Sequence, residues 1–338
     1  MTRTILLDHL KGREVAALIE DGALSDLLVE ADAPTPGTIY RAVADRSVKG
    51  QGGMFLRTPD GSAFLRAGKG ISPGDSFLVQ VTGYAEPGKA IPVTHRILFK
   101  SRYAIVTPDA PGLNISRAIR DEDVRDDLLE LAHGCMDGSD FGLILRSAAA
   151  GADGEDVARD IEAMHSLAAQ VMSDQGTGVE TMTEGDGPHL LAWRDWPQQA
   201  DIVTEPGCLE THGALDLIDA AAQPEVALKP GTMLVEPTRA LVAVDINTGS
   251  DTSPAAGLKA NMSAARALPA ALRVRGLGGQ IVVDLAPMAK KDRHVFEQTL
   301  RAAFRADDVE TSFVGWTPLG HVELNRKRAR VPLGELLT

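Results

Sequence analysis

Short runs of apolar residues dominate the first hundred positions of the chain. Three runs lie within residues 1–35, and six more lie between Gly37 and Thr107, separated by Gly, Pro or Asp. Short strands with turn residues at this spacing are typical of a small β-barrel or sandwich. The pattern therefore predicts three N-terminal strands followed by a β-rich segment.

Helical and strand-like periods alternate in the remainder, which predicts a mixed α/β (α+β) protein. The stretch 173–235 has few long periods, and we expect loops and short elements there. Helices are expected at 119–132, 153–172, 258–276 and 290–307, and strands at 141–148, 240–247, 280–285, 311–316 and 321–328.

Two aspartates end neighbouring strands of the predicted C-terminal β–α–β unit. Asp245 lies near the end of ALVAVDIN and Asp284 near the end of QIVVDL. If the strands are parallel neighbours, both carboxylates lie at one sheet edge, where they repel each other unless a cation separates them. Mg²⁺ is commonly held by one or two carboxylates with waters and substrate phosphates. Asn247 points to the same strand face as Asp245.

An alternative stays open for each aspartate, because Asp and Asn at strand ends also cap turns. The paired placement favours the metal site over two independent caps.

Charge is distributed unevenly along the 338 residues. The net charge of −13 argues against a polyanion-binding protein if it is spread evenly, because phosphate neutralisation needs Lys and Arg. Lys+Arg against Asp+Glu is 13 against 11 in residues 1–105, 7 against 25 in 106–230, and 14 against 11 in 231–338. The acidity is thus confined to the middle, and both flanking blocks remain compatible with nucleic acid.

Cysteines and the N-terminus favour a reduced, cytoplasmic setting. Cys135 and Cys208 are isolated, so neither a disulfide framework nor a CxxC metal site is expected. The N-terminal apolar run is too short for a signal peptide, and no apolar run is long enough to span a membrane.

Aromatic and basic residues share neighbouring strands of the β-rich segment. Phe55 and Phe64 are accompanied by Arg57, Arg66, Lys69 and Lys89. Aromatic rings stack bases and cations follow the backbone in proteins that bind single strands. The alternative is that both phenylalanines lie in the barrel core.

Several C-terminal motifs resemble the RNase E/G family of bacterial endoribonucleases. They are ALVAVDINTGS, the helix centred on Asn261, LRVRGLGGQIVVD and the closing HVELNRKR, in the family's order and at similar spacing. The resemblance is strong over about 236–338, moderate over about 36–150 and poor in between, where the chain is short.

The resemblance implies an Mg²⁺-dependent endoribonuclease, with Mn²⁺ as a substitute ion, that leaves 5′-phosphate and 3′-hydroxyl ends on single-stranded RNA. It assigns the metal to Asp245 and Asp284, assistance to Asn247, and RNA contacts to Phe55, Phe64 and Lys89. The implied domains are N-terminal strands (1–35) packing on an RNase H-like region, an OB-fold RNA-binding domain (36–107), a shortened RNase H-like and sensor-like region (108–235), and an α/β catalytic domain (236–338).

The family's 5′-monophosphate sensor corresponds to Arg146 and Ser147. A solvated surface role is the alternative for Arg146. Ser101 replaces a glycine that lets phosphate approach the backbone, and Glu310 stands where a basic sensor residue is expected. An acid repels phosphate, so these departures argue against sensing.

Other departures concern assembly. The family's two-cysteine zinc tether would follow the closing motif, so no zinc, no zinc-linked dimer and no scaffold tail are expected, and a homo-oligomer of another kind stays open. The acidic middle is expected to face away from RNA or to meet a protein.

Further basic residues near the C-terminus allow two interpretations each. Arg326, Lys327, Arg328 and Arg330 form either an RNA-facing edge or a solvated charged strand. Lys290 and Lys291 either hold a phosphate near the metal or open the exposed face of the next helix. His294 and His321 are single histidines and are left out of the site.

Three hypotheses follow. The leading one is an RNase E/G-type endoribonuclease, and the second is an RNA-binding homologue with weak or no catalysis. The third is an unrelated acidic α/β enzyme that uses the Asp pair on a small phosphoester.

Overall fold

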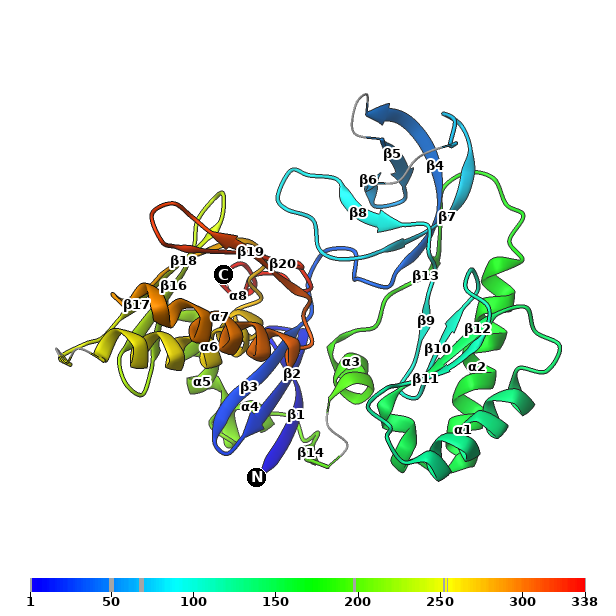
Figure 1. Ribbon diagram of the computed structural model, residues 1–338. Coiled ribbons are helices and arrows are strands. Elements are labelled where there is room, and N and C mark those ends of the chain that lie inside the picture. The colour runs from blue at the N-terminus through cyan, green and yellow to red at the C-terminus, as the bar shows by residue number, and fades with distance from the viewer. Residues whose placement is uncertain are drawn as a thin grey trace. The chain divides into compact units, whose positions relative to one another are not determined.

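The computed structural model describes residues 2–48, 52–66, 70–196, 199–251, 253 and 255–337. The chain divides into two compact units. We call Asp32–Gln198 the inserted unit, and Met1–Ala31 together with Gln199–Thr338 the split unit. Both combine helices with β-sheets, so the predicted mixed α/β class is confirmed (Figure 1).

A closed five-stranded β-barrel begins the inserted unit. Its strand order is β4-β5-β6-β8-β7, and β7 pairs with β4 to close it. Alternate residues point inward, and Tyr40, Met54, Leu56 and Val79 lie in the barrel core. The strands are β4 (Ile39–Val48), β5 (Gly53–Thr58), β6 (Gly61–Leu65), β7 (Ser76–Val81) and β8 (Ile91–Thr94), with β13 (Glu180–Thr183) added beside β4.

A second sheet, covered by helices, completes the inserted unit. Asp121 and Asp153 cap its two long helices by accepting backbone N–H groups, and acidic residues fill both first turns, as the helix dipole favours. The sheet order is β11-β12-β10-β9. The elements are β9 (Phe99–Lys100), β10 (Ala104–Thr107), β11 (Leu113–Ile115), α1 (Glu122–Cys135), β12 (Gly142–Leu145), η1 (Ser147–Gly151), α2 (Gly154–Met172) and α3 (Pro188–Asp195).

The N-terminal strands belong to the split unit. They form a sheet of order β14-β1-β2-β3, in which β14 runs parallel to β1. Leu6, Leu27, Leu209, Ile218 and Val274 share one core, which joins this sheet to helices from the second half of the chain. The elements are β1 (Arg3–Leu10), β2 (Arg13–Glu20), β3 (Ala23–Val29), β14 (Asp201–Val203), α4 (Cys208–Thr211) and α5 (Ala214–Ala222).

A six-stranded sheet carries the predicted β–α–β unit. Its order is β15-β16-β17-β18-β20-β19, and one face packs against α6 and α7. The elements are β15 (Glu225–Ala227), β16 (Thr232–Pro237), β17 (Val242–Asn247), α6 (Ala256–Val274), β18 (Gly279–Asp284), η2 (Lys290–Asp292), α7 (Arg293–Arg305), β19 (Thr311–Trp316), β20 (Val322–Arg326) and α8 (Leu333–Leu336).

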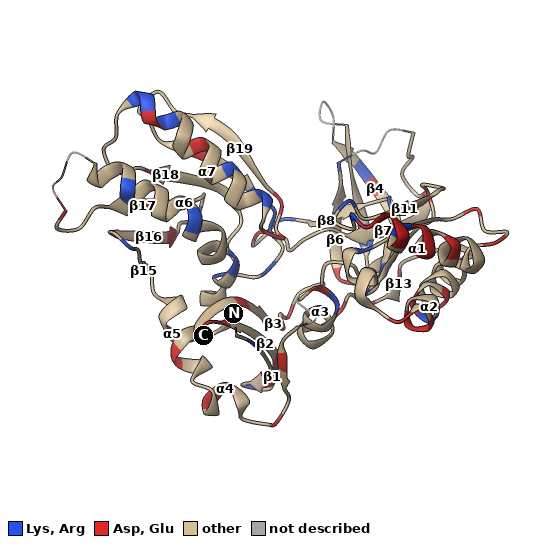
Figure 2. Ribbon diagram, turned by 60° about the horizontal axis from the view of Figure 1, so that its bottom comes forward, with Lys and Arg blue, Asp and Glu red and all other residues tan. Residues whose placement is uncertain are grey.

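Acidic and basic residues gather on different helices. Figure 2 shows Asp and Glu along α1 and α2 and Lys and Arg along α6 and α7, in line with the block sums of the sequence. None of the helices in the described ranges is long and apolar enough to cross a membrane.

Candidate active site

Asp245 and Asp284 are direct register partners. β17 and β18 are parallel neighbours, and Asp245 pairs with Asp284 at the carboxyl end of the ladder. The expected pairing is therefore confirmed. In β17 the residues Val244 and Ile246 are buried, whereas Asp245 and Asn247 are exposed on the other face.

Each carboxylate is held by one neighbouring side chain. Asn247 Nδ2 donates to Asp245 Oδ2 at 2.8 Å. His321 Nδ1 lies 3.0 Å from Asp284 Oδ1. Among the described residues, no backbone N–H donates to either carboxylate, so turn capping does not explain their placement. The second oxygen of each carboxylate likewise has no hydrogen-bond partner within the described ranges.

Buried contacts fix the chain directly after Asp284. Asn261 is fully buried in α6; its Nδ2 donates to the Ala286 carbonyl at 2.8 Å, and Ala286 N–H donates to its Oδ1 at 3.0 Å. A Cβ at Gly257 would lie 1.8 Å from the Pro287 carbonyl oxygen, so α6 approaches this segment too closely for any side chain there. These contacts explain why α6 has Asn at position 261 and Gly at position 257.

The paired carboxylates suit Mg²⁺ better than a metal that needs a full protein cage. Among the described residues there is no group of three or more His, Cys, Asp or Glu suited to a metal ion. Mg²⁺ keeps several waters and uses one or two carboxylates, which this edge supplies. The two exposed acids at one register position thus fit a hydrated divalent cation.

His321, a single histidine that the sequence leaves outside the predicted site, contacts Asp284. Val283 pairs with Val322 in the antiparallel β18–β20 ladder, so Asp284 and His321 are the next residues on facing strands. The register between β18 and β20 is the signal that identifies His321. This register can be used only when β20 is known to lie beside β18.

Phe55 and Phe64 face each other on the outside of the barrel. They are register partners in β5 and β6, with ring centroids 5.2 Å apart. Both are half-buried and alternate with core residues, so the core alternative is wrong for them. Arg46 lies over the Phe55 ring at 4.8 Å from its centroid. A Cβ at Gly53 would lie 2.3 Å from Phe64 Cζ, so this glycine leaves the ring its space.

The basic residues near this pair differ in their surroundings. Arg57 and Arg66 are exposed. Lys89 pairs with Glu86 at 2.6 Å and remains largely exposed. Lys69 lies outside the described residues.

Arg146 is already engaged by a carboxylate. Its Nη2 donates to Asp195 Oδ1 at 2.6 Å, and its Nη1 donates to the Ser101 carbonyl at 2.7 Å. Burial raises the pKa of Asp195, but hydrogen bonds and charge from Arg194 and Arg146 lower it overall. The solvated alternative is therefore wrong for Arg146, and an intramolecular anion occupies its guanidinium.

The other positions of the predicted sensor differ in their surroundings. Ser147 is exposed at the start of η1. Ser101 is buried, and its hydroxyl donates to Asp160. Glu310 is exposed directly before β19.

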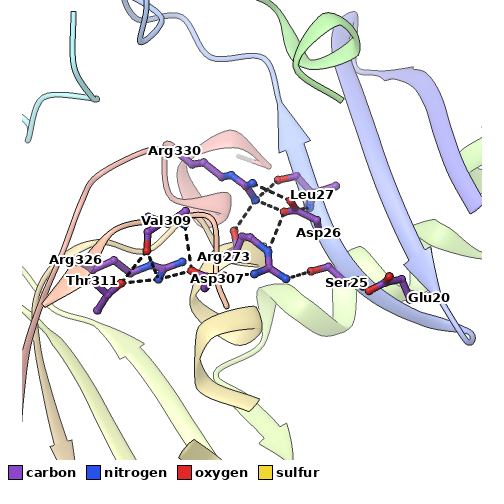
Figure 3. Close-up of polar contacts among 10 residues, drawn as sticks. All are labelled: Glu20, Ser25, Asp26, Leu27, Arg273, Asp307, Val309, Thr311, Arg326 and Arg330. Carbon is purple, nitrogen blue, oxygen red and sulfur yellow. Dashed lines mark hydrogen bonds and ion pairs between the residues drawn. The ribbon is translucent and has the colours of Figure 1, made fainter. Parts of the chain in front are cut away.

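Two basic residues near the C-terminus, Arg326 and Arg330, form ion pairs within the protein. For these two, both the RNA-facing edge and the solvated charged strand are wrong. Arg326 is 1% exposed and pairs at 2.7 Å with Asp307, which is also 1% exposed. Arg330 donates to Asp26 and to the Leu27 carbonyl. Figure 3 shows Arg273 between these two aspartates. Lys327 is exposed, and Arg328 is half-buried.

Lys290 and Lys291 are exposed in η2, directly before α7, which agrees with their placement at the opening of that helix. Their proposed phosphate contact stays a hypothesis.

Known ribonucleases match the chain over its whole length. Ribonuclease G of Salmonella typhimurium is 27% identical over 100% of this chain and 82% of its own length, and that of Escherichia coli K12 is 26% identical with the same coverage. Ribonuclease E of Nostoc sp. is 26% identical over 96% of this chain, which spans only 56% of that relative. The ribonuclease G alignments run over 407 residues against 338 here, so those relatives carry segments that this chain lacks.

The Ribonuclease E/G family model matches residues 99–200 and 196–329, more than half of the chain. The chain therefore belongs to the ribonuclease E/G family.

Proposed function

We propose that the protein is an Mg²⁺-dependent endoribonuclease that cleaves single-stranded RNA in RNA processing or decay. The register pairing of Asp245 with Asp284 carries this proposal, because it places two ion-binding carboxylates at one sheet edge. The names of the relatives, ribonuclease G and ribonuclease E, support RNA as the substrate. Family membership also makes the hypothesis of an unrelated small-substrate enzyme wrong.

Each residue of the site has a distinct role in this proposal. Asp245 and Asp284 hold the cation, with Mn²⁺ as a substitute for Mg²⁺. Asn247 fixes the orientation of the Asp245 carboxylate through its amide. A divalent cation held there would supply positive charge for the scissile phosphate and would make water a stronger nucleophile, and the products we propose carry 5′-phosphate and 3′-hydroxyl ends.

We assign RNA binding to the barrel, which we interpret as an OB-fold, and catalysis to the six-stranded sheet with α6 and α7. Residues 108–235 then correspond to the shortened RNase H-like region, and the N-terminal strands pack on its last part, through Leu209 and Ile218. The acidic helices α1 and α2 repel RNA, so we expect them to face solvent or a protein partner. The proposed compartment is the bacterial cytoplasm.

The barrel aromatics are expected to stack bases. Replacing Phe55 or Phe64 with alanine should weaken binding of a labelled single-stranded RNA about 5- to 150-fold, since one stacked base contributes about 1–3 kcal/mol. Fluorescence anisotropy in EDTA measures binding without cleavage. Trp193→Ala is the matched control, because Trp193 is an exposed aromatic residue of α3, outside the barrel. Unchanged RNA affinity in both phenylalanine variants would show that this surface of the barrel does not bind RNA.

A cleavage assay tests the proposed activity. An A/U-rich, single-stranded RNA is incubated with the protein and Mg²⁺, with EDTA as the control, and the product ends are mapped. We expect internal cleavage that requires the cation and leaves 5′-phosphates. Cleavage at the same rate in EDTA would contradict a metal-dependent mechanism.

The same RNA carries either a 5′-monophosphate or a 5′-hydroxyl in two parallel arms of the assay. We expect equal cleavage rates, because Asp195 already occupies the guanidinium of Arg146. A clear preference for the monophosphate would show that Asp195 is displaced and that sensing survives.

The second candidate function is RNA binding with weak or no catalysis. It is favoured by the occupied Arg146 and by Glu310 at a position expected to be basic. Salt-dependent RNA binding without cleavage in the assay would support this function instead.

A further inference from the structure

A histidine from the turn before β20 contacts the carboxylate pair. His321 Nδ1 lies 3.0 Å from Asp284 Oδ1, and the His321 side chain is 30% exposed. An ionised carboxylate can only accept hydrogen bonds, so Nδ1 is the donor. Asp284 and His321 lie one position beyond the last pair of the β18–β20 ladder, Val283 with Val322.

Backbone hydrogen bonds hold this histidine in place. Thr317 N–H donates to the His321 carbonyl at 2.9 Å, and His321 N–H donates to Thr317 Oγ1 at 3.1 Å. Gly320 has a φ of +97°, and a Cβ there would lie 2.8 Å from Arg293 Nη2. The turn therefore needs glycine at this position, and His321, the next residue, reaches Asp284 from it.

Each of the two acids is supported by one neighbouring side chain. Asn247 donates to one oxygen of Asp245, and His321 donates to one oxygen of Asp284. A carboxylate with one oxygen fixed loses rotational freedom, so its second oxygen is oriented for a ligand. Hydrogen bonds of this kind raise metal affinity, and their loss commonly costs about 10- to 100-fold in affinity or activity.

We propose that His321 is a positioning residue that fixes the Asp284 carboxylate for a divalent cation, as Asn247 fixes Asp245. This inference rests on the metal site of the proposed function. It assigns His321 no contact with the RNA and no role in proton transfer.

Calorimetric titration of the full chain with Mn²⁺ alone tests the role without RNA. We expect His321→Leu to weaken Mn²⁺ binding about 10-fold, because the leucine lacks a donor. His321→Asn should recover most of the affinity, since its amide can donate from a position close to Nδ1. His294→Leu is the matched control, because His294 is exposed on α7 of the same unit. Thermal melting verifies that all variants are folded.

Activity supplies an independent readout. At saturating RNA, His321→Leu should lower kcat at low Mg²⁺, and raising the Mg²⁺ concentration should recover it, because the defect lies in cation binding. A kcat defect that persists at saturating Mg²⁺ would overturn the positioning role.

Two further results would overturn this role: His321→Leu binds Mn²⁺ as the wild type does, or His321→Asn binds as weakly as His321→Leu. Failure of the proposed function is separate. A wild-type protein that binds Mn²⁺ with the expected dependence on His321, yet cleaves no RNA, would refute the nuclease and leave the positioning role supported.

Discussion

Asp284→Asn is expected to lower the rate of RNA cleavage by about 10³-fold. The change replaces one of two register-paired carboxylates with a neutral amide of nearly equal size. A bound cation contributes several kcal/mol to transition-state stabilisation, and about 4 kcal/mol corresponds to 10³ in rate. Asp245→Asn should cause a loss of similar size, and the double variant should be little worse, because residues that act as a unit are not additive.

The matched control is Glu236→Gln. Glu236 is an exposed carboxylate on β16 and pairs with Ala243 of β17. It lies two residues after Leu234, which is the register partner of Asp245. This substitution removes one negative charge from the same sheet but leaves Asp245 and Asp284 unchanged, so the rate of RNA cleavage should stay near that of the wild type. The Asp284 side chain is 62% exposed, so thermal stability should change little in Asp284→Asn. Cleavage at wild-type rates in Asp284→Asn would refute the two-aspartate site.

Asp307→Asn is expected to destabilise the split unit by about 3–5 kcal/mol, the usual cost of removing one partner from a buried ion pair. Asp307 pairs with both Arg273 and Arg326, and it is 1% exposed. Burial lowers the pKa of Arg326, and the charge of Asp307 opposes that effect. Within the described residues, Arg326 Nη2 already lacks a hydrogen-bond partner. The neutral amide would leave the guanidinium buried without its counter-charge.

Urea unfolding followed by circular dichroism measures this loss. Asp156→Asn is the control, because Asp156 pairs with Arg159 on the exposed face of α2, and exposed pairs contribute about 0–1 kcal/mol. A cost for Asp307→Asn as small as that of the control would show that Arg326 finds another partner or reaches water.

Local pattern predicted most of the elements and the central pair of the site. The strand ends at Asp245 and Asp284 followed from short apolar runs and one intervening helix, because a β–α–β crossover brings sequential strands side by side. The alternation of residues along β5 and β6 predicts that Phe55 and Phe64 point outward, although composition alone also allowed both residues to lie in the barrel core.

Residues whose surroundings come from distant segments were not predictable in this way. Arg330 reads as a solvated charge, but its partner Asp26 lies 304 positions away. Arg146 is occupied by Asp195 from α3, in a stretch without a clear period. His321 required knowledge of which strand follows β18 in the sheet. In each case the contact depends on tertiary pairing, which single-sequence periodicity does not contain.

The division of the split unit around the inserted unit has a consequence for biosynthesis. Residues 32–198 form a unit with its own cores and leave the ribosome before the partners of β1, β2 and β3 are made. Leu6 and Leu27 reach Ile218 only when α5 has been synthesised, and Val274 only when α6 has followed. The apolar strands β1, β2 and β3 therefore lack most of their final packing partners during most of translation. The same order means that Asp245 and Asp284, which lie in the last segment to emerge, pair only after the whole β-barrel of β4–β8 has been synthesised.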